Sequence, residues 1–174
     1  MKAQGHFDGF GVAAQRAIIA GHVDASALPR VADLLAQGAG DADIDYRIAG
    51  TADAGGRPAL EVSLSGALPL TCQRCLQAFR WPVEQTTLLL LARDERELAR
   101  IDDEIHEHEA VLAAAPLDVV ALVEDELLLT LPFVPRCPEA DCPAARDGRT
   151  GAAGAAPAAS AFGVLAELKA APEK

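Results

Sequence analysis

Four cysteines in two pairs constrain this chain more than any other feature of its sequence. The first pair stands in LTCQRCL as Cys72 and Cys75, and the second stands in RCPEADC as Cys137 and Cys142. A CxxC turn lets two thiolates converge on one ion, and a second pair completes a tetrahedral shell of four sulfurs, the geometry that suits structural zinc. A zinc site would require a fold that brings the two pairs together.

Other uses of the cysteines remain open at this point. In a thioredoxin-like redox protein the CxxC motif lies at a helix N-terminus, whereas Cys72 and Cys75 connect two expected strands. The cysteines could also be buried as small apolar residues that hold no metal. Metal-dependent hydrolysis is disfavoured, because an all-cysteine shell leaves no position for an activated water.

The N-terminal stretch shows no secretion signal, because Gln15 and Arg16 interrupt its only apolar run. No window approaches the ~18 uninterrupted apolar residues of a membrane helix. We therefore expect a cytoplasmic protein with no membrane partner. In a reducing compartment the cysteines are expected as thiols or thiolate ligands and not as disulfides.

Hydrophobic periodicity predicts an α+β fold. After a mobile-looking start, the Pro and Gly positions favour a short helix over 27–37. Apolar and polar residues then alternate over 44–48 and 60–65, on either side of a Gly-Gly turn, and a third strand is expected over 79–91. We predict an antiparallel β-meander with a cysteine knuckle between its second and third strands, packed by a few helices.

A second helix is expected from Asp118, as the cap, to about residue 131, where Pro132 blocks its continuation. Projected at 100° per residue, Glu124 falls on the apolar arc, whereas Asp125 and Glu126 fall outside it. A buried carboxylate costs several kcal/mol unless it is paired or protonated, so Glu124 needs a partner. The candidates for that partner are Arg74, Arg80 and Arg136.

The charge of the chain is strongly acidic but unevenly distributed. It has 15 Lys and Arg against 26 Asp and Glu, a net charge of −11, and residues 93–126 hold 12 acids and 3 bases. A broad basic nucleic-acid surface is therefore excluded. The acidic stretch suits a basic protein partner, and RNA contact is expected only near the knuckle, where the candidate residues are Arg74, Arg80, Trp81 and Arg136.

We expect residues 1–142 to form a single domain. From 143 to 159, 13 of 17 residues are Ala, Gly or Pro, a composition with too little apolar surface to offset the entropy of ordering. This stretch is predicted to be a flexible linker. Residues 160–174 carry a small apolar group of side chains and are predicted to be a docking segment.

Several of these motifs occur together in one known family. The segments CQRCL, VEDELLLTLPFVP and SAFGVLAELK, with Cys137 and Cys142, resemble the YceD family of large ribosomal RNA subunit accumulation proteins. The resemblance implies a non-catalytic ribosome biogenesis factor that supports 23S rRNA accumulation or processing and large-subunit assembly. It also implies that the partner is 23S rRNA or its precursor, a basic large-subunit ribosomal protein, or both, with no small-molecule substrate.

Carried onto this chain, the family's metal positions fall on the four cysteines, which implies a structural Zn(II). Its acidic helix motif falls on Glu124, Asp125 and Glu126. Two other functions stay open from the residues alone. One is a zinc-dependent or thiol-redox enzyme that uses Cys72 and Cys75, and the other is an adaptor for a basic ribosomal protein that makes no RNA contact.

Overall fold

The structure is a computed structural model that describes residues 5–106, 108–138 and 140–143. The predicted linker, apart from residue 143, and the predicted docking segment lie outside the described residues. By its contacts the chain divides into two units, Met1–Cys137 and Pro138–Lys174. All of the helices and strands of the described residues belong to the first unit.

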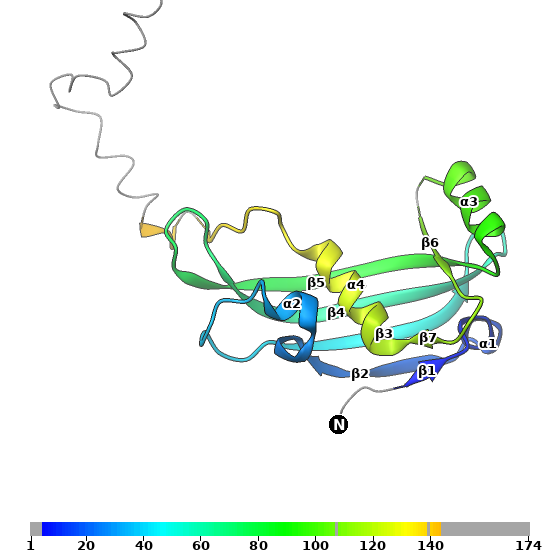
Figure 1. Ribbon diagram of the computed structural model, residues 1–174, viewed down its shortest axis with the longest axis horizontal. Coiled ribbons are helices and arrows are strands. Elements are labelled where there is room, and N and C mark those ends of the chain that lie inside the picture. Colours follow the sequence, from blue (N-terminus) through cyan, green and yellow to red (C-terminus); the bar gives the residue numbers. More distant parts are fainter. Residues whose placement is uncertain (1–4, 107, 139, 144–174) are drawn as a thin grey trace, which may run out of the picture. The chain divides into compact units, whose positions relative to one another are not determined.

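A five-stranded sheet in the order β2-β3-β4-β5-β6 forms the centre of the first unit (Figure 1). Its first four strands pair antiparallel, and β6 pairs parallel to β5. The predicted three-strand meander is confirmed as β3, β4 and β5. A separate short ladder joins β1, His6–Phe7, to β7, Leu117–Asp118. The strands of the main sheet are β2 Ile18–Asp24, β3 Asp43–Ala52, β4 Pro58–Thr71, β5 Ala78–Ala92 and β6 Glu109–Leu112.

Alternation along the central strands places one set of apolar side chains on a single face. Opposite residues in register, such as Ile48 and Val62, share that face, because side chains alternate along a strand.

The turn between β3 and β4 is closed by the Asp53 N–H, which donates to the Arg57 carbonyl at 3.0 Å. Gly56 in this turn has φ +78°, a left-handed conformation that glycine adopts without strain.

Helix α4, Val119–Thr130, packs across this apolar face with the shorter α2, Pro29–Ala32, beside it (Figure 1). Asp118 caps α4 as predicted, because its side chain accepts a hydrogen bond from the Ala121 N–H at 2.9 Å. The core lies between α4 and the sheet. Its largest fully buried side chains include Ile44, Ile48, Leu60, Val62, Leu64 and Leu127.

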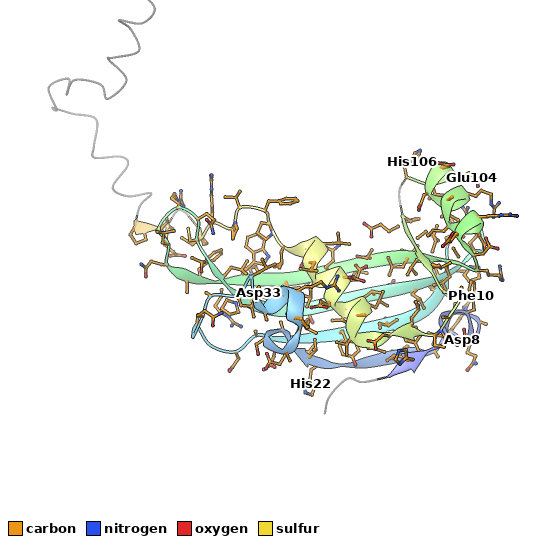
Figure 2. All side chains as sticks on the ribbon, in the orientation of Figure 1. Asp8, Phe10, His22, Asp33, Glu104 and His106 are labelled. Carbon is orange, nitrogen blue, oxygen red and sulfur yellow. The ribbon has the colours of Figure 1, made fainter. Side chains whose placement is uncertain are left out.

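The N-terminal stretch is not the mobile-looking start that the sequence suggested, because it contains α1, Gly9–Gln15, and the edge strand β2. A Cβ at Gly50 would lie 1.9 Å from the Val12 carbonyl oxygen, so the absence of a side chain there lets α1 approach β3. Phe10 lies on α1 (Figure 2). The Arg93 guanidinium lies 4.7 Å from the centroid of its ring. These contacts depend on residues far away in the chain, so periodicity did not reveal them.

The helix expected over 27–37 is shorter than predicted. A 3₁₀ turn, Ala25–Ala27, precedes α2, and α2 ends at Ala32. The chain then runs along β4, where Leu35 forms a bridge with Leu70 and the Ala36 N–H donates to the Pro69 carbonyl at 2.8 Å. Pairing with the sheet therefore replaces the last turns of the expected helix.

The acidic stretch contains a helix that the sequence analysis did not predict, α3, Glu95–Glu104. Asp94 caps it by accepting from the N–H groups of Arg96 and Glu97. Ile101 is buried and faces a small second cluster of apolar residues that includes Leu90 and Ala92. Among the described residues, no helix has the length and apolar character needed to cross a membrane.

Candidate metal centre

The first cysteine pair lies in the turn that connects β4 to β5. The Cys72 N–H donates to the Gln77 carbonyl at 2.9 Å, and the Leu76 N–H donates to the Cys72 carbonyl at 2.8 Å. Leu76 has φ +62°, in the left-handed region that is costly for a residue with a Cβ. The tight turn directs Cys72 and Cys75 to the same side.

Cys137 reaches this turn from the segment that follows α4. The Gln73 N–H donates to the Pro135 carbonyl at 2.8 Å, and Nη2 of Arg74 lies 3.3 Å from the Cys137 carbonyl oxygen, to which it donates. These bonds place Cys137 Sγ 3.5 Å from Cys72 Sγ and 3.8 Å from Cys75 Sγ. Residues from two distant parts of the chain thus meet at one point.

The sulfurs of Cys72, Cys75, Cys137 and Cys142 all lie within 4.8 Å of one another, which confirms the predicted four-cysteine cluster. None of these four described cysteines forms a disulfide. Four sulfurs around one zinc at ~2.3 Å would lie roughly 3.8 Å apart in a tetrahedron, which the distances in the cluster approach. The donor set is entirely soft sulfur, so the residues fit zinc and leave no ligand position open.

The surroundings of Cys72 favour its thiolate. Burial by itself raises the pKa of this thiol, but hydrogen bonds with the backbone of Cys137, Cys75 and Arg74 outweigh it and lower the pKa to about 6. One of these donors is the Arg74 N–H, 3.4 Å from the sulfur. A thiolate is the form of cysteine that binds metal, so this turn presents a ligand in its binding state.

Glu124 is buried, as the helical projection predicted, with 7% of its surface exposed. The prediction that Arg74, Arg80 or Arg136 would pair with Glu124 is wrong. Arg30 is the partner: its Nε and Nη2 donate to Glu124 Oε2 at 3.0 Å each. The Arg30 N–H also donates to Glu124 Oε1 at 2.7 Å, so one carboxylate joins α4 to the start of α2.

The sequence contains a feature that indicates Arg30 as a partner of a distant acceptor. The first N–H groups of a helix need acceptors from outside it, and Leu28, at the position before α2, has no side chain that can accept. Glu124 supplies the acceptor from 94 residues away. Asp125, on the exposed side of α4, completes the arrangement, with Oδ1 2.6 Å from Arg30 Nη1. The hydrogen bonds to Asp125 and Glu124 raise the pKa of Arg30.

Glu126 was expected in solvent, and this expectation is wrong, because only 4% of its surface is exposed. Burial raises the pKa of its carboxyl group, a hydrogen bond with Thr87 lowers it, and the nearby charges of Glu109 and Asp125 raise it further. The projection failed because the buried face of α4 is wider than the projected arc: Leu122, four residues before Glu126 and on the same side of the helix, is buried as well. Thr87 faces the core from β5 and gives Glu126 a polar contact.

The candidate RNA-contact residues lie in different settings. Trp81 is half-buried and meets Phe79 edge-on, with ring centroids 6.4 Å apart. Arg80 points to the other face of β5, because successive residues alternate, and its Nη1 donates to the Asp41 carbonyl. Arg74 lies in the cysteine turn and Arg136 is exposed just before Cys137. Only the two at the knuckle, Arg74 and Arg136, are neighbours of the metal centre in sequence.

Comparison with known proteins places these features in one family. The sequence model of the family described as "Large ribosomal RNA subunit accumulation protein YceD" matches residues 60–169, well over half of the chain. No curated protein and no solved structure matches the chain. The matched span includes all four cysteines and the Glu124–Glu126 motif. The chain therefore belongs to the YceD family, whose description assigns it to accumulation of large-subunit ribosomal RNA.

Proposed function

We propose that the protein is a non-catalytic factor that supports accumulation or processing of 23S rRNA during assembly of the large ribosomal subunit. The family match over residues 60–169 carries the proposal. The family description names rRNA accumulation and no reaction. A closed shell of four thiolates supports the same view, because structural zinc sites have such shells whereas catalytic ones keep a position open.

In this proposal the four cysteines hold a structural Zn(II). The ion would join the β4–β5 turn to the segment that follows α4, in addition to the hydrogen bonds from Gln73 and Arg74 that already link them. Glu124, Asp125 and Glu126 then have a structural task. Through Arg30 the first two of them hold α2 on α4. Glu124 and Glu126 are buried, which leaves only Asp125 of the three within reach of an RNA partner.

Contact with rRNA is proposed at the knuckle, through Arg74 and Arg136, with Arg80 and Trp81 as the further candidates along β5. Arginine donors bind phosphate oxygens, and the strongly acidic remainder of the chain would confine that contact to a small area. The affinity for RNA should then decrease only weakly as the salt concentration rises, because the contact neutralises few phosphates.

The test is the ratio of 23S to 16S rRNA in cells that lack the chain. We expect the ratio to fall, to recover with the wild-type chain, and to stay low with Cys72→Ser. Glu84→Gln, an exposed change on β5, is the matched control and should restore the ratio. A 23S to 16S ratio that does not change on deletion would contradict the proposal.

Co-purification with a tagged chain then separates the two kinds of partner. Large-subunit rRNA precursor that is recovered only without nuclease, and that crosslinks to Arg74 or Arg136, would support direct RNA contact. Recovery of a basic ribosomal protein that survives nuclease, with no crosslink between the chain and RNA, would instead favour the adaptor alternative.

A further inference from the structure

A groove opens between the segment after α2 and the segment after α4. It has a volume of about 330 Å³, and seven of its ten lining residues are apolar. These seven are Leu34, Leu35, Leu70, Leu131, Pro132, Phe133 and Pro135. A groove of this composition at the surface offers a place for a bulky apolar side chain of another molecule.

Two of the large apolar side chains that line this groove are exposed. Phe133 is fully exposed, and Leu34 exposes half of its surface. Val134, which follows Phe133 in the chain, also exposes about half of its surface. Single exposed apolar residues are ordinary, but several together around a groove mark an interaction site. Aromatic side chains in particular dominate the binding energy of protein interfaces.

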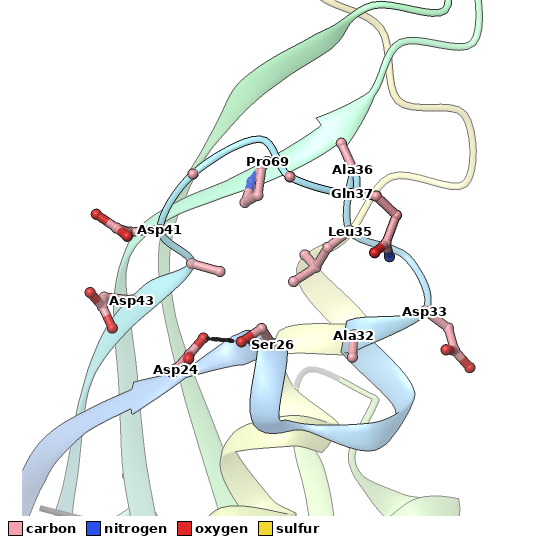
Figure 3. Close-up of a pocket in the computed structure, with 13 residues that line it drawn as sticks. Asp24, Ser26, Ala32, Asp33, Leu35, Ala36, Gln37, Asp41, Asp43 and Pro69 are labelled. Atoms are coloured by element: carbon pink, nitrogen blue, oxygen red, sulfur yellow. Dashed lines mark hydrogen bonds between the residues drawn. The ribbon is translucent and has the colours of Figure 1, made fainter.

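A second cavity, of about 460 Å³, adjoins the groove and shares Asp33 and Leu35 with it. Four aspartates line this cavity: Figure 3 shows Asp24, Asp41 and Asp43 on one side of it and Asp33 on the other. Asp33 follows α2 directly (Figure 2). In the part of the chain that the structure describes, none of the four carboxylates forms an ion pair.

We propose that the groove and the acidic cavity together bind a basic segment of a partner protein. A bulky apolar residue of that segment would enter the groove beside Phe133, and its Lys or Arg residues would lie over the four aspartates. The proposal deepens the proposed function and rests on it only for the source of the segment, a basic protein of the large-subunit precursor.

Charge decides between the classes of partner. The four carboxylates form no ion pair with a described residue, and the guanidinium of Arg80 beside them donates to the Asp41 carbonyl and not to a carboxylate. They therefore repel the phosphates of RNA, anionic lipid and acidic peptides. RNA would also leave the aliphatic wall formed by Leu34, Leu35 and Leu131 uncovered. A basic protein segment with an apolar anchor is complementary to both halves of the surface.

The metal centre supports this surface from one end. Phe133 and Pro135 stand between α4 and Cys137, and the Pro135 carbonyl accepts the hydrogen bond from Gln73 in the cysteine turn. A metal bound at the cluster would therefore fix the wall of the groove that carries Phe133. Removal of the metal should weaken partner binding without any change in the partner-binding residues.

The test uses the purified full chain and labelled peptides, with affinity measured by fluorescence anisotropy. The probe peptide has one Phe flanked by Lys and Arg, and its two controls replace Phe by Ala or the basic residues by Glu. We expect Phe133→Ser to weaken binding of the probe about tenfold, the size of an interface hot spot. Because Phe133 is fully exposed, thermal unfolding should not change.

The charged half is tested with Asp33→Asn combined with Asp41→Asn. The matched control, Asp102→Asn with Asp103→Asn on α3, removes the same two charges from exposed positions elsewhere. We expect the first pair to weaken binding at least threefold at low salt, more than the second pair does, and the difference to shrink in high salt. Equal losses for the two pairs would mean non-specific attraction and would overturn the proposal.

Two further outcomes would also overturn it. The first is that single-stranded RNA displaces the probe from the wild-type chain and no longer binds the Phe133→Ser variant. This result would make the surface an RNA site. The second is a gain in probe affinity on Leu165→Ser, which would make residues 160–174 of the same chain the occupant.

If the Phe133→Ser variant no longer binds the probe but cells that carry it accumulate 23S rRNA normally, the inference is overturned and the proposed function stands. If the wild-type chain binds the probe but its deletion causes no rRNA defect, the proposed function is overturned and the binding surface stands.

Discussion

The helix α4 and the segment that follows it are held to the rest of the molecule in different ways. In the helix, Leu127 is fully buried against the sheet in one large apolar cluster. Beyond its C-terminus, the segment to Cys137 leaves Phe133 fully exposed and meets the cysteine turn through hydrogen bonds from Gln73 and Arg74 and through the cysteine sulfurs. Burial of apolar surface stabilises the first region, whereas the second depends on what its thiolates bind.

The difference teaches which parts of the fold respond to which change. Loss of a core contact should lower the stability of the whole unit, because packed interiors unfold cooperatively. Loss of a thiolate or of a metal should release the knuckle and leave the sheet intact. Each prediction below tests this division, in order of the size of its effect on the free energy of unfolding.

Leu127→Ala should have the largest effect. Removal of a buried leucine side chain leaves a cavity and costs about 2–5 kcal/mol. Urea unfolding measures this loss, and the transition should stay single because the whole unit loses stability. Leu129→Ala, at a position on the same helix with 64% exposure, is the control and should change the free energy of unfolding by less than about 0.5 kcal/mol. Similar losses for the two variants would mean that α4 is not packed as described.

Cys72→Ser should lower stability only while zinc is present. A ligand that binds the folded state stabilises it in proportion to its affinity, so the wild type gains from zinc and the variant does not. We expect zinc affinity to fall by more than the roughly 10- to 100-fold that changes in outer-shell residues cost. Thermal unfolding with zinc, and again with a chelator, measures the difference. A deficit that persists in chelator would show that Cys72 acts by packing and not as a ligand.

Glu124→Gln should cost about 1.5–3 kcal/mol, the range for hydrogen bonds to charged groups, reduced towards the lower end because Arg30 is half exposed. Chemical unfolding measures the cost, and Arg30→Met with the double variant completes a mutant cycle. A coupling near zero would contradict the view that one carboxylate clamps α2 to α4.

Glu126→Gln should have the smallest effect, and its sign should be the opposite. The pKa of Glu126 is raised in the folded state, so the fold retains a proton that the unfolded chain releases. This contribution to stability is present below the ordinary carboxyl pKa of about 4.3 and is lost as pH rises through the raised value. Glutamine is neutral throughout, so the variant should unfold at a higher temperature than the wild type at pH 8. Near pH 4 the two should be alike, and a variant less stable at pH 8 would refute the assigned burial.

The parts of the structure that follow a local pattern were predictable from the sequence. Alternation located β3, β4 and β5, Asp118 marked the start of α4, and the spacing of the cysteines indicated their cluster. A buried Glu124 also followed from its place on the apolar arc.

Features that depend on distant contacts were not predictable in the same way. Strand β2 exists because it pairs with β3, and α1 because Gly50 leaves room for it. The choice of Arg30 as partner of Glu124 depends on a helix start 94 residues away. Glu126 is buried because the face of α4 that meets the sheet extends to Leu122 and Glu126, and its hydrogen-bond partner Thr87 lies on β5, which a helical projection does not contain.

Hydrogen exchange of the full chain, with zinc and after chelation, tests the division between core and knuckle most directly. We predict that chelation removes the protection of the amides of Cys72, Gln73 and Leu76, while the amides of β3 and β4 that pair between Ile44 and Thr51 stay protected. Unchanged protection of the knuckle on chelation, or loss of protection throughout the sheet, would contradict the account.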